Sequence, residues 1–380
     1  MTGRRRLRDG WRPCLVVFLG SRLALSLVSI VAVGPLEPLD PVDVPGRPGP
    51  AATPGWHNAI DGTERQDAVW YLALAERGWS PDDASAAFFP LYPLAVRAVS
   101  WVLPGDDLPA ALLVSNLAFL GALLALFALT AEAFGERAAR RTVVVAAAFP
   151  TAFFFLAPYS ESLFLFLSIL TFREARHDRW GGVALFGGLA ALTRSVGVLL
   201  VAAMLVEAVR GRSERRPLAP RLAGAAAVAL GPLVWFGWWG LVHGRWLAPL
   251  DAQADWQREP TWPWASIADA IGYAWRFQSY WLLDVAVVGL AVAGLALATP
   301  RLRLSEASYG WLSVLLPLAD PFPPRPLLSV PRFMAVVFPA MWGLAGVGAG
   351  RKVPWPLVIA VLTGGWVLCV VLFVNWLHLF

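Results

Sequence analysis

Three charged residues stand in strongly apolar surroundings, where an unpaired charge is costly. Glu161 and Arg194 each lie at the polar tip between two short apolar stretches, and Arg332 begins an apolar stretch near the C-terminus. A buried carboxylate can bind a hydroxyl group or pair with an arginine, and a guanidinium can hold a phosphate through its fork of N–H donors. The alternatives are structural: a helix cap for Glu161, an ion pair with Glu161 for Arg194, and a snorkelling arginine at a helix start for Arg332.

The composition indicates the kind of chain that must position these residues. Hydrophobic residues make up 58% of the 380 residues and charged residues only 15%, whereas an ordinary soluble domain carries about a quarter charged residues. A soluble enzyme and a disordered or fibrous chain are therefore excluded. The net charge of +5 comes from short basic blocks between apolar stretches, so it does not indicate a nucleic-acid partner. We expect an all-α, multi-pass membrane protein with a single transmembrane domain over residues 1–380.

Apolar segments predict about eleven membrane-spanning helices, each needing about 20 apolar residues to cross. The segments are 14–33, 108–129, 142–157, 162–172, 181–192, 195–209, 222–242, 281–299, 307–319, 331–348 and 354–377. Six basic blocks then fall on one side, and the acidic residues between 40 and 107 fall on the other. By the positive-inside rule this predicts a cell-membrane protein with a cytoplasmic N-terminus and an external C-terminus.

Two of the predicted hairpins are too short to cross a bilayer by their apolar residues alone. The segment 162–172 makes only about 16 Å of helix, about half of a bilayer core of about 30 Å. It must recruit the polar sequence PYSES (158–162), and the segments 181–192 and 195–209 meet at Thr193 and Arg194. Both polar tips should therefore sink below the outer surface, which is tolerated only where they line a cavity.

Two long external loops complete the predicted topology. The first loop, residues 34–87, begins with a Pro- and Gly-rich stretch that we expect to be an extended linker. Its second part, residues 67–78, has apolar residues at helical spacing and predicts a short helix lying at the membrane interface. The second loop, residues 243–280, is rich in tryptophan, which serves both as an interfacial anchor and as a platform for sugars.

Five motifs in a fixed order resemble a known family over nearly the whole chain. They are RQDAVWYLALAERGW (65–79), AFFPLYPLAVR (87–97), FPTAFFFLAPYSESLFLFLSIL (149–170), ALTRSVG (191–197) and SVPRFMAVVFP (329–339). The series resembles the PIG-V-like mannosyltransferases of the GT-C class. The resemblance implies transfer of mannose from a polyprenyl-phosphate-mannose donor to a lipid-linked, glycolipid or lipoglycan acceptor, with inversion, on the extracytoplasmic face. One departure is Gln66, which stands where the family usually has tryptophan.

The resemblance also implies which residues form the site. An acceptor hydroxyl needs a general base within hydrogen-bond reach, and Asp67 is the expected catalytic residue. The alternative is that Asp67 caps a helix, with Asp61 and Glu64 as rival bases. The expected substrate-binding residues, with Arg194 and Arg332 as candidates for the donor phosphate, are Arg65, Trp70, Tyr71, Phe89, Tyr92, Tyr159, Glu161, Arg194, Gln253, Trp256 and Arg332.

No cofactor or metal is expected, because no histidine shares a helix face with a carboxylate at metal-ligand spacing. The two cysteines, Cys14 and Cys369, predict neither a disulfide nor a zinc site. Three other functions stay open from the residues. The first is a GT-C transferase for another polyprenyl-phosphate sugar, the second is a transporter or flippase of lipid-linked sugar, and the third is a non-catalytic subunit that binds lipid.

Overall fold

The computed structural model describes residues 3–34, 36, 39–103, 105–210, 217–254, 258–348 and 354–377. The fold is mostly helical. Its helices are α1 (Gly3–Ala32), α2 (Asp67–Arg77), α3 (Leu91–Ser100), α4 (Asp107–Phe134), α5 (Glu136–Ala148), α6 (Glu161–Arg176), α7 (Trp180–Ala191), α8 (Leu199–Arg210), α9 (Leu218–Ala227), α10 (Leu230–His243), α11 (Ala248–Ala254), α12 (Pro263–Arg276), α13 (Leu282–Ala298), α14 (Leu304–Leu318), α15 (Val330–Met334), α16 (Phe338–Leu344) and α17 (Trp355–Val374).

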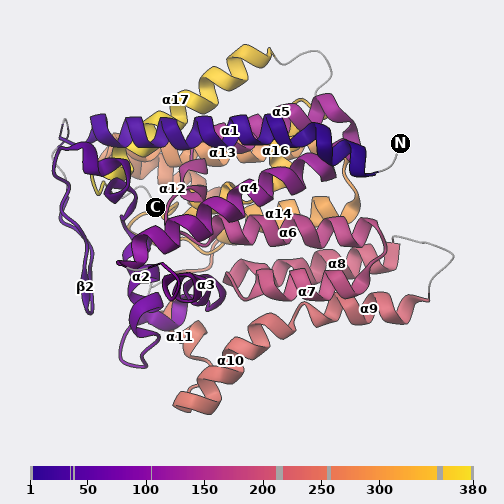
Figure 1. The fold of residues 1–380 in the computed structure, drawn as a ribbon, viewed down its shortest axis with the longest axis horizontal. Helices are drawn as coiled ribbons and strands as arrows, with labels where there is room; N and C mark the ends of the chain where they lie inside the picture. The colour runs from indigo at the N-terminus through magenta and orange to yellow at the C-terminus, as the bar shows by residue number, and fades with distance from the viewer. Residues whose placement is uncertain are drawn as a thin grey trace.

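The long helices run roughly side by side, and α2, α3, α11 and the small β hairpin lie at one end of them (Figure 1). Helix α4 packs on both α1 and α6, and α13 packs along α16. The N-terminus lies at one end of this bundle, and the described chain ends near the other end, close to α2 (Figure 1).

Each of the eleven apolar segments predicted to span the membrane contains helix in the structure. Within the described residues, only α1, α4, α13 and α17 belong to helical runs long and apolar enough to cross a membrane alone, and α9 with α10 makes a fifth span if that bent pair is counted as one. These helices indicate a membrane protein. The count of eleven crossings stays a prediction.

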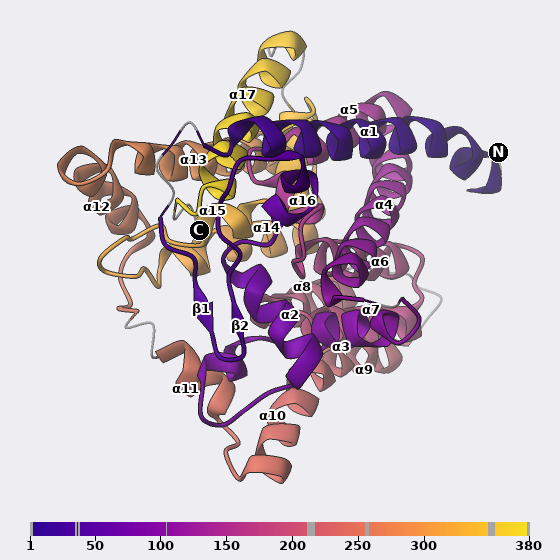
Figure 2. The ribbon, with the colours of Figure 1, turned by 60° about the vertical axis from the view of Figure 1, so that its left-hand side comes forward.

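The start of the first external loop differs from the extended linker that its composition predicts. Strands β1 (Asp43–Val44) and β2 (Arg47–Pro48) form a small antiparallel hairpin that lies beside α2 (Figure 2). Val44 is buried with Val69 and Trp376, and the Arg47 side chain bonds to Glu64 at 2.8 Å. The prediction missed the hairpin because its anchors come from distant parts of the chain.

The helix predicted over residues 67–78 is present as α2, and its position at the membrane interface stays a prediction. Most of its side chains are buried, and the helix packs against α3 and α4. Apolar residues at helical spacing indicate a covered face, but the spacing does not say whether lipid or protein covers it.

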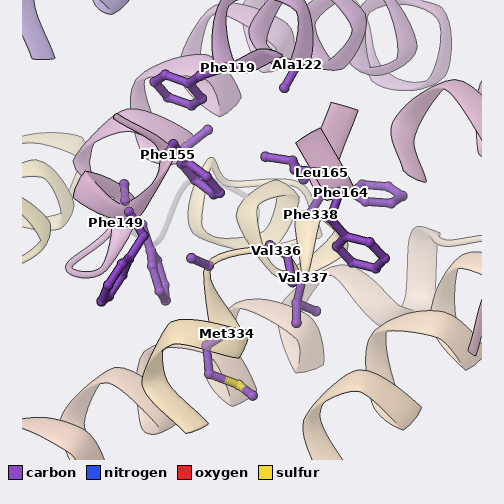
Figure 3. Packing of buried hydrophobic residues seen from close by; sticks show 14 of the residues in the cluster. Phe119, Ala122, Phe149, Phe155, Phe164, Leu165, Met334, Val336, Val337 and Phe338 are labelled. Atoms are coloured by element: carbon purple, nitrogen blue, oxygen red, sulfur yellow. The ribbon is translucent and has the colours of Figure 1, made fainter. Parts of the chain in front are cut away.

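The core beneath the loops is rich in aromatic and aliphatic side chains. Figure 3 shows Phe119 of α4 facing Phe155, with Phe164 of α6 close to the segment 336–338. The rings of Phe119 and Phe155 stack with centroids 4.9 Å apart. This packing holds α6, which begins at Glu161, beside the segment that follows α15, the helix that carries Arg332.

Candidate active site

A cavity of about 490 Å³ opens between α2, α8, α10, α14 and α15. One part of its wall carries charged and polar side chains and the rest is apolar. The lining residues are Asp67, Tyr71, Ala87, Phe88, Phe89, Thr193, Arg194, Ser195, Val196, Val198, Leu199, Pro232, Phe236, Leu250, Arg258, Leu316, Pro317, Asp320, Ser329, Arg332 and Phe333. The prediction that the tip at Thr193 and Arg194 lines a cavity agrees with this arrangement.

Four charged residues form a continuous ion-pair chain at the polar part of the cavity. The Arg332 Nη1 donates to Oδ2 of Asp67 at 2.5 Å, and its Nε lies 3.1 Å from Oε1 of Glu161. The same Glu161 oxygen accepts a hydrogen bond from Nη1 of Arg194. The chain therefore runs Asp67–Arg332–Glu161–Arg194 and balances two carboxylates against two guanidinium groups.

Burial differs along this ion-pair chain. Glu161 is fully buried, whereas the Asp67 side chain is 24% exposed. Arg194 and Arg332 are buried but still line the cavity. Asp67 is thus the carboxylate that a substrate can reach, and Glu161 lies behind the wall, where it compensates both arginines.

Local structure explains the positions of the two carboxylates. Asp67 is the first residue of α2 and Glu161 the first residue of α6, and a helix N-terminus stabilises negative charge. Neither of the residues before them provides a side-chain cap. The residue before α2 is Gln66, whose φ of 54° is left-handed and whose side chain donates to the Trp376 carbonyl at 3.3 Å.

Two tyrosines link the polar tip of 158–162 to the first external loop. The Tyr71 hydroxyl lies 2.8 Å from Oγ of Ser160, and the Tyr159 hydroxyl donates to the carbonyl of Arg65 at 2.7 Å. Burial, reinforced by the charge of Glu161, raises the pKa of Tyr71 to about 12. Tyr71 lines the cavity, so it stays a neutral hydroxyl there, while Tyr159 is buried behind it.

Arg65 takes a structural position instead of a place in the cavity wall. Its guanidinium is buried and donates to the carbonyls of Asp61, Glu64 and Val374 at 2.9–3.0 Å. It also lies over the Trp376 ring at 5.2 Å. Burial lowers the pKa of Arg65 to about 10. The side chain ties the first external loop to the end of α17.

The other predicted binding residues divide between the wall and the interior. Phe89 lines the cavity. Trp70 stacks on Phe88 with centroids 5.4 Å apart, and buried Tyr92 bonds to Ser115 at 2.8 Å; neither of them lines the cavity.

The second external loop, residues 243–280, places the unpredicted residue Arg258 in the cavity wall, and it also contains the predicted residues Gln253 and Trp256. Gln253 belongs to α11, but its side chain lies outside the described residues, as does the whole of Trp256. Arg258 lines the cavity, although a single arginine in a polar loop carries no sequence signal. Phe333 also lines the cavity, and the Arg194 guanidinium lies 5.1 Å from its ring centre. The motif SVPRFMAVVFP could have indicated Phe333.

No group of three or more His, Cys, Asp or Glu side chains within the described ranges could hold a metal ion. Independence from metals stays a prediction. Cys14 and Cys369 are both free and buried.

Comparison with known families supports the resemblance drawn from the motifs. Residues 51–213 match the family described as Mannosyltransferase (PIG-V), which confirms the resemblance over this part of the chain. Asp67, Glu161 and Arg194 lie inside the matched segment, whereas Arg258 and Arg332 lie beyond it. A search of curated proteins gave no match.

The fold is similar to solved GT-C glycosyltransferases. ArnT from Cupriavidus metallidurans bound to undecaprenyl phosphate is 14% identical, with 96% of this chain and 76% of that chain covered and a TM-score of 0.53. The structure of the same protein in the apo state has a TM-score of 0.54 to this chain, with the same shares of the two chains covered. The oligosaccharyltransferase of Archaeoglobus fulgidus tethered to an acceptor peptide is 12% identical, over 95% of this chain and 55% of that chain, with a TM-score of 0.42. The family match over residues 51–213 supports a glycosyltransferase, and the likeness to ArnT shows the fold alone.

Proposed function

We propose that this protein transfers mannose from polyprenyl-phosphate-mannose to a glycolipid or lipoglycan acceptor, with inversion, at the extracytoplasmic face of the membrane. The observation that carries the proposal is the reachable Asp67 carboxylate, set beside arginines in a cavity with a long apolar wall. The polar part suits a sugar and a phosphate, and the apolar part suits the lipid that carries them.

The surroundings of Asp67 support a role as general base. Arg332 binds one of its oxygens, Oδ2, while Oδ1 has no hydrogen bond to any described residue and is free for an acceptor hydroxyl. In the proposed step Asp67 takes the hydroxyl proton while the acceptor oxygen forms a bond to C1 of mannose. The bond between C1 and the phosphate oxygen breaks, and polyprenyl phosphate leaves with the electron pair. Attack opposite the leaving group inverts the anomeric carbon.

The test compares two neighbouring aspartates in membranes supplied with radiolabelled polyprenyl-phosphate-mannose. Asp67→Asn should lower mannose transfer by about 100-fold or more, since general-base catalysis contributes about that much. Asp61→Asn is the matched control, because the Asp61 side chain does not line the cavity and its backbone carbonyl, which the substitution keeps, accepts the hydrogen bonds from Arg65 and from the Glu64 N–H. The control should keep transfer close to that of the wild type.

The alternative functions give different results in the same assay. Full transfer by Asp67→Asn would reject Asp67 as the base and return the question to the rivals named from the sequence, Asp61, Glu64 and Glu161. Transfer of another sugar but not mannose would identify a different polyprenyl-phosphate-sugar transferase. If no sugar is transferred while labelled lipid crosses the bilayer, the protein is a transporter and the proposal fails.

A further inference from the structure

Arg258 reaches the cavity from the second external loop, on a segment held by backbone hydrogen bonds. Glu259 N–H donates to the carbonyl of Pro321 at 3.2 Å, and Thr261 N–H donates to the carbonyl of Ala319 at 2.9 Å. The Arg258 Nη1 donates to the backbone carbonyl of Asp320 at 2.7 Å. The guanidinium is therefore positioned by the chain that follows α14.

The charge of Arg258 is compensated less well than that of the other two arginines in the wall. Arg194 and Arg332 each contact a buried or half-buried carboxylate, whereas no carboxylate of the described chain lies within 4.0 Å of Arg258. Burial lowers the pKa of Arg258, the charge of Asp320 opposes this effect, and the weaker effect of the Arg332 charge lowers the pKa again. Arg258 and Arg332 thus bring two positive charges to the same cavity, and the partner of Arg258 is an uncharged backbone carbonyl. This arrangement favours binding of an anion by the two guanidinium groups.

We propose that Arg258 binds the phosphate of the lipid-linked donor, together with the cavity side of Arg332; this assignment rests on the proposed function. A guanidinium has five N–H donors, and the Arg258 side chain makes only one hydrogen bond to the described residues. Cleavage of the donor converts a phosphodiester into a phosphomonoester, which gains negative charge. A cation that binds the developing phosphate charge of the transition state more strongly than it binds the intact donor lowers the reaction barrier. The same cation also holds the donor in place.

Asp320 tests whether Arg258 acts only by offsetting a nearby negative charge. The Asp320 side chain also lines the cavity and is exposed, while its backbone carbonyl accepts the Arg258 hydrogen bond and is kept in Asp320→Asn. If Arg258 served only to offset the charge of the Asp320 carboxylate, Asp320→Asn and Arg258→Gln would have the same effect. If Arg258 binds phosphate, Asp320→Asn should leave phosphate binding unchanged or make it tighter.

The binding experiment uses the purified full chain in detergent and does not depend on activity. Stabilisation against thermal unfolding is titrated with undecaprenyl phosphate, with undecaprenol as the uncharged lipid and with inorganic phosphate as the free ion. Arg258→Gln should weaken undecaprenyl phosphate binding by about tenfold or more, because hydrogen bonds to a charged group are worth about that factor. Undecaprenol binding should stay unchanged, and Arg258→Lys should recover part of the loss.

Arg245→Gln is the matched control from the same loop. Its Nη1 also donates to a backbone carbonyl, that of Pro81, at 2.8 Å, but it lines a different pocket. This variant should bind undecaprenyl phosphate like the wild type. In transfer assays Arg258→Gln should raise the donor KM and lower kcat.

Each remaining result has a definite meaning. Equal binding of undecaprenyl phosphate by wild type and Arg258→Gln overturns the assignment, and so does a wild type that does not distinguish the phosphate from undecaprenol. Stabilisation by inorganic phosphate alone would show a site for the free ion and also overturn it. Arg258-dependent lipid-phosphate binding without mannose transfer would keep the phosphate site and reject the mannosyltransferase.

Discussion

At the scale of single residues, one guanidinium connects the expected base to a buried carboxylate. Arg332 contacts Asp67 and Glu161, and Glu161 also accepts from Arg194. The sequence analysis left Arg194 with two roles, phosphate binding or an ion pair with Glu161. The structure contains the ion pair, which leaves phosphate binding by Arg194 a prediction. Glu161 does not line the cavity; its carboxylate holds Arg194 and Arg332 in position there.

Removing the Glu161 charge should strongly destabilise the protein. Glu161→Gln leaves two buried guanidinium groups with one fewer carboxylate, and breaking a buried ion pair costs about 3 kcal/mol or more. Denaturant unfolding in detergent micelles measures the loss. Glu136→Gln is the control, because the pair of Glu136 with Arg140 is more than half exposed on both sides; its loss should cost less than about 1 kcal/mol. Equal stabilities would contradict a compensating role for Glu161.

At the scale of elements, a close helix contact fixes the region that carries Arg332. Helix α16 follows α15 after a short turn and packs on α13, where Gly294 and Gly343 allow the backbones to meet. A Cβ on Gly343 would lie 1.7 Å from the Gly294 carbonyl oxygen. Small residues at helix contacts are typical of membrane proteins, and here they set the distance between the two helices.

A single methyl group at this contact should loosen the structure. Gly294→Ala would place its Cβ 2.4 Å from the Ala340 carbonyl oxygen, and overpacking of this kind costs about 1–3 kcal/mol. Transfer activity should fall with stability, because α16 leads directly from α15. Gly289→Ala in the same helix meets nothing within 4 Å and should be neutral. Indistinguishable unfolding of the two variants would show that the contact is not close in the membrane.

At the scale of the whole molecule, the two termini of the described chain lie at opposite ends of the helix bundle (Figure 1). Besides α8, α10, α14 and α15, the cavity is lined by α2, which lies at the end opposite to the start of α1 (Figure 1). This arrangement agrees with an odd number of crossings and with a site on the face opposite to the basic blocks. The orientation itself is a proposal from the positive-inside rule.

Cysteine labelling in intact cells tests that orientation. Ala51 and Glu136 are exposed, and they lie on opposite sides in the proposed topology. A membrane-impermeant maleimide should label Ala51→Cys in intact cells, and label Glu136→Cys only after permeabilisation. The native Cys14 and Cys369 are both fully buried, so the background should be low. The opposite pattern of labelling would reverse the proposed topology and place the cavity in the cytoplasm.

The sequence alone determined the class of protein and most of its helices, because apolar length and the cost of an unpaired charge in lipid are local properties. The same cost singled out Glu161, Arg194 and Arg332 before any contact was known. Only the tertiary structure decided which of these charges meet, that Arg65 points away from the cavity, and that Arg258 enters it. Such pairings depend on the relative placement of helices and on loop conformation. Residues separated by up to 265 positions, as Asp67 and Arg332 are, leave no local pattern of their contact.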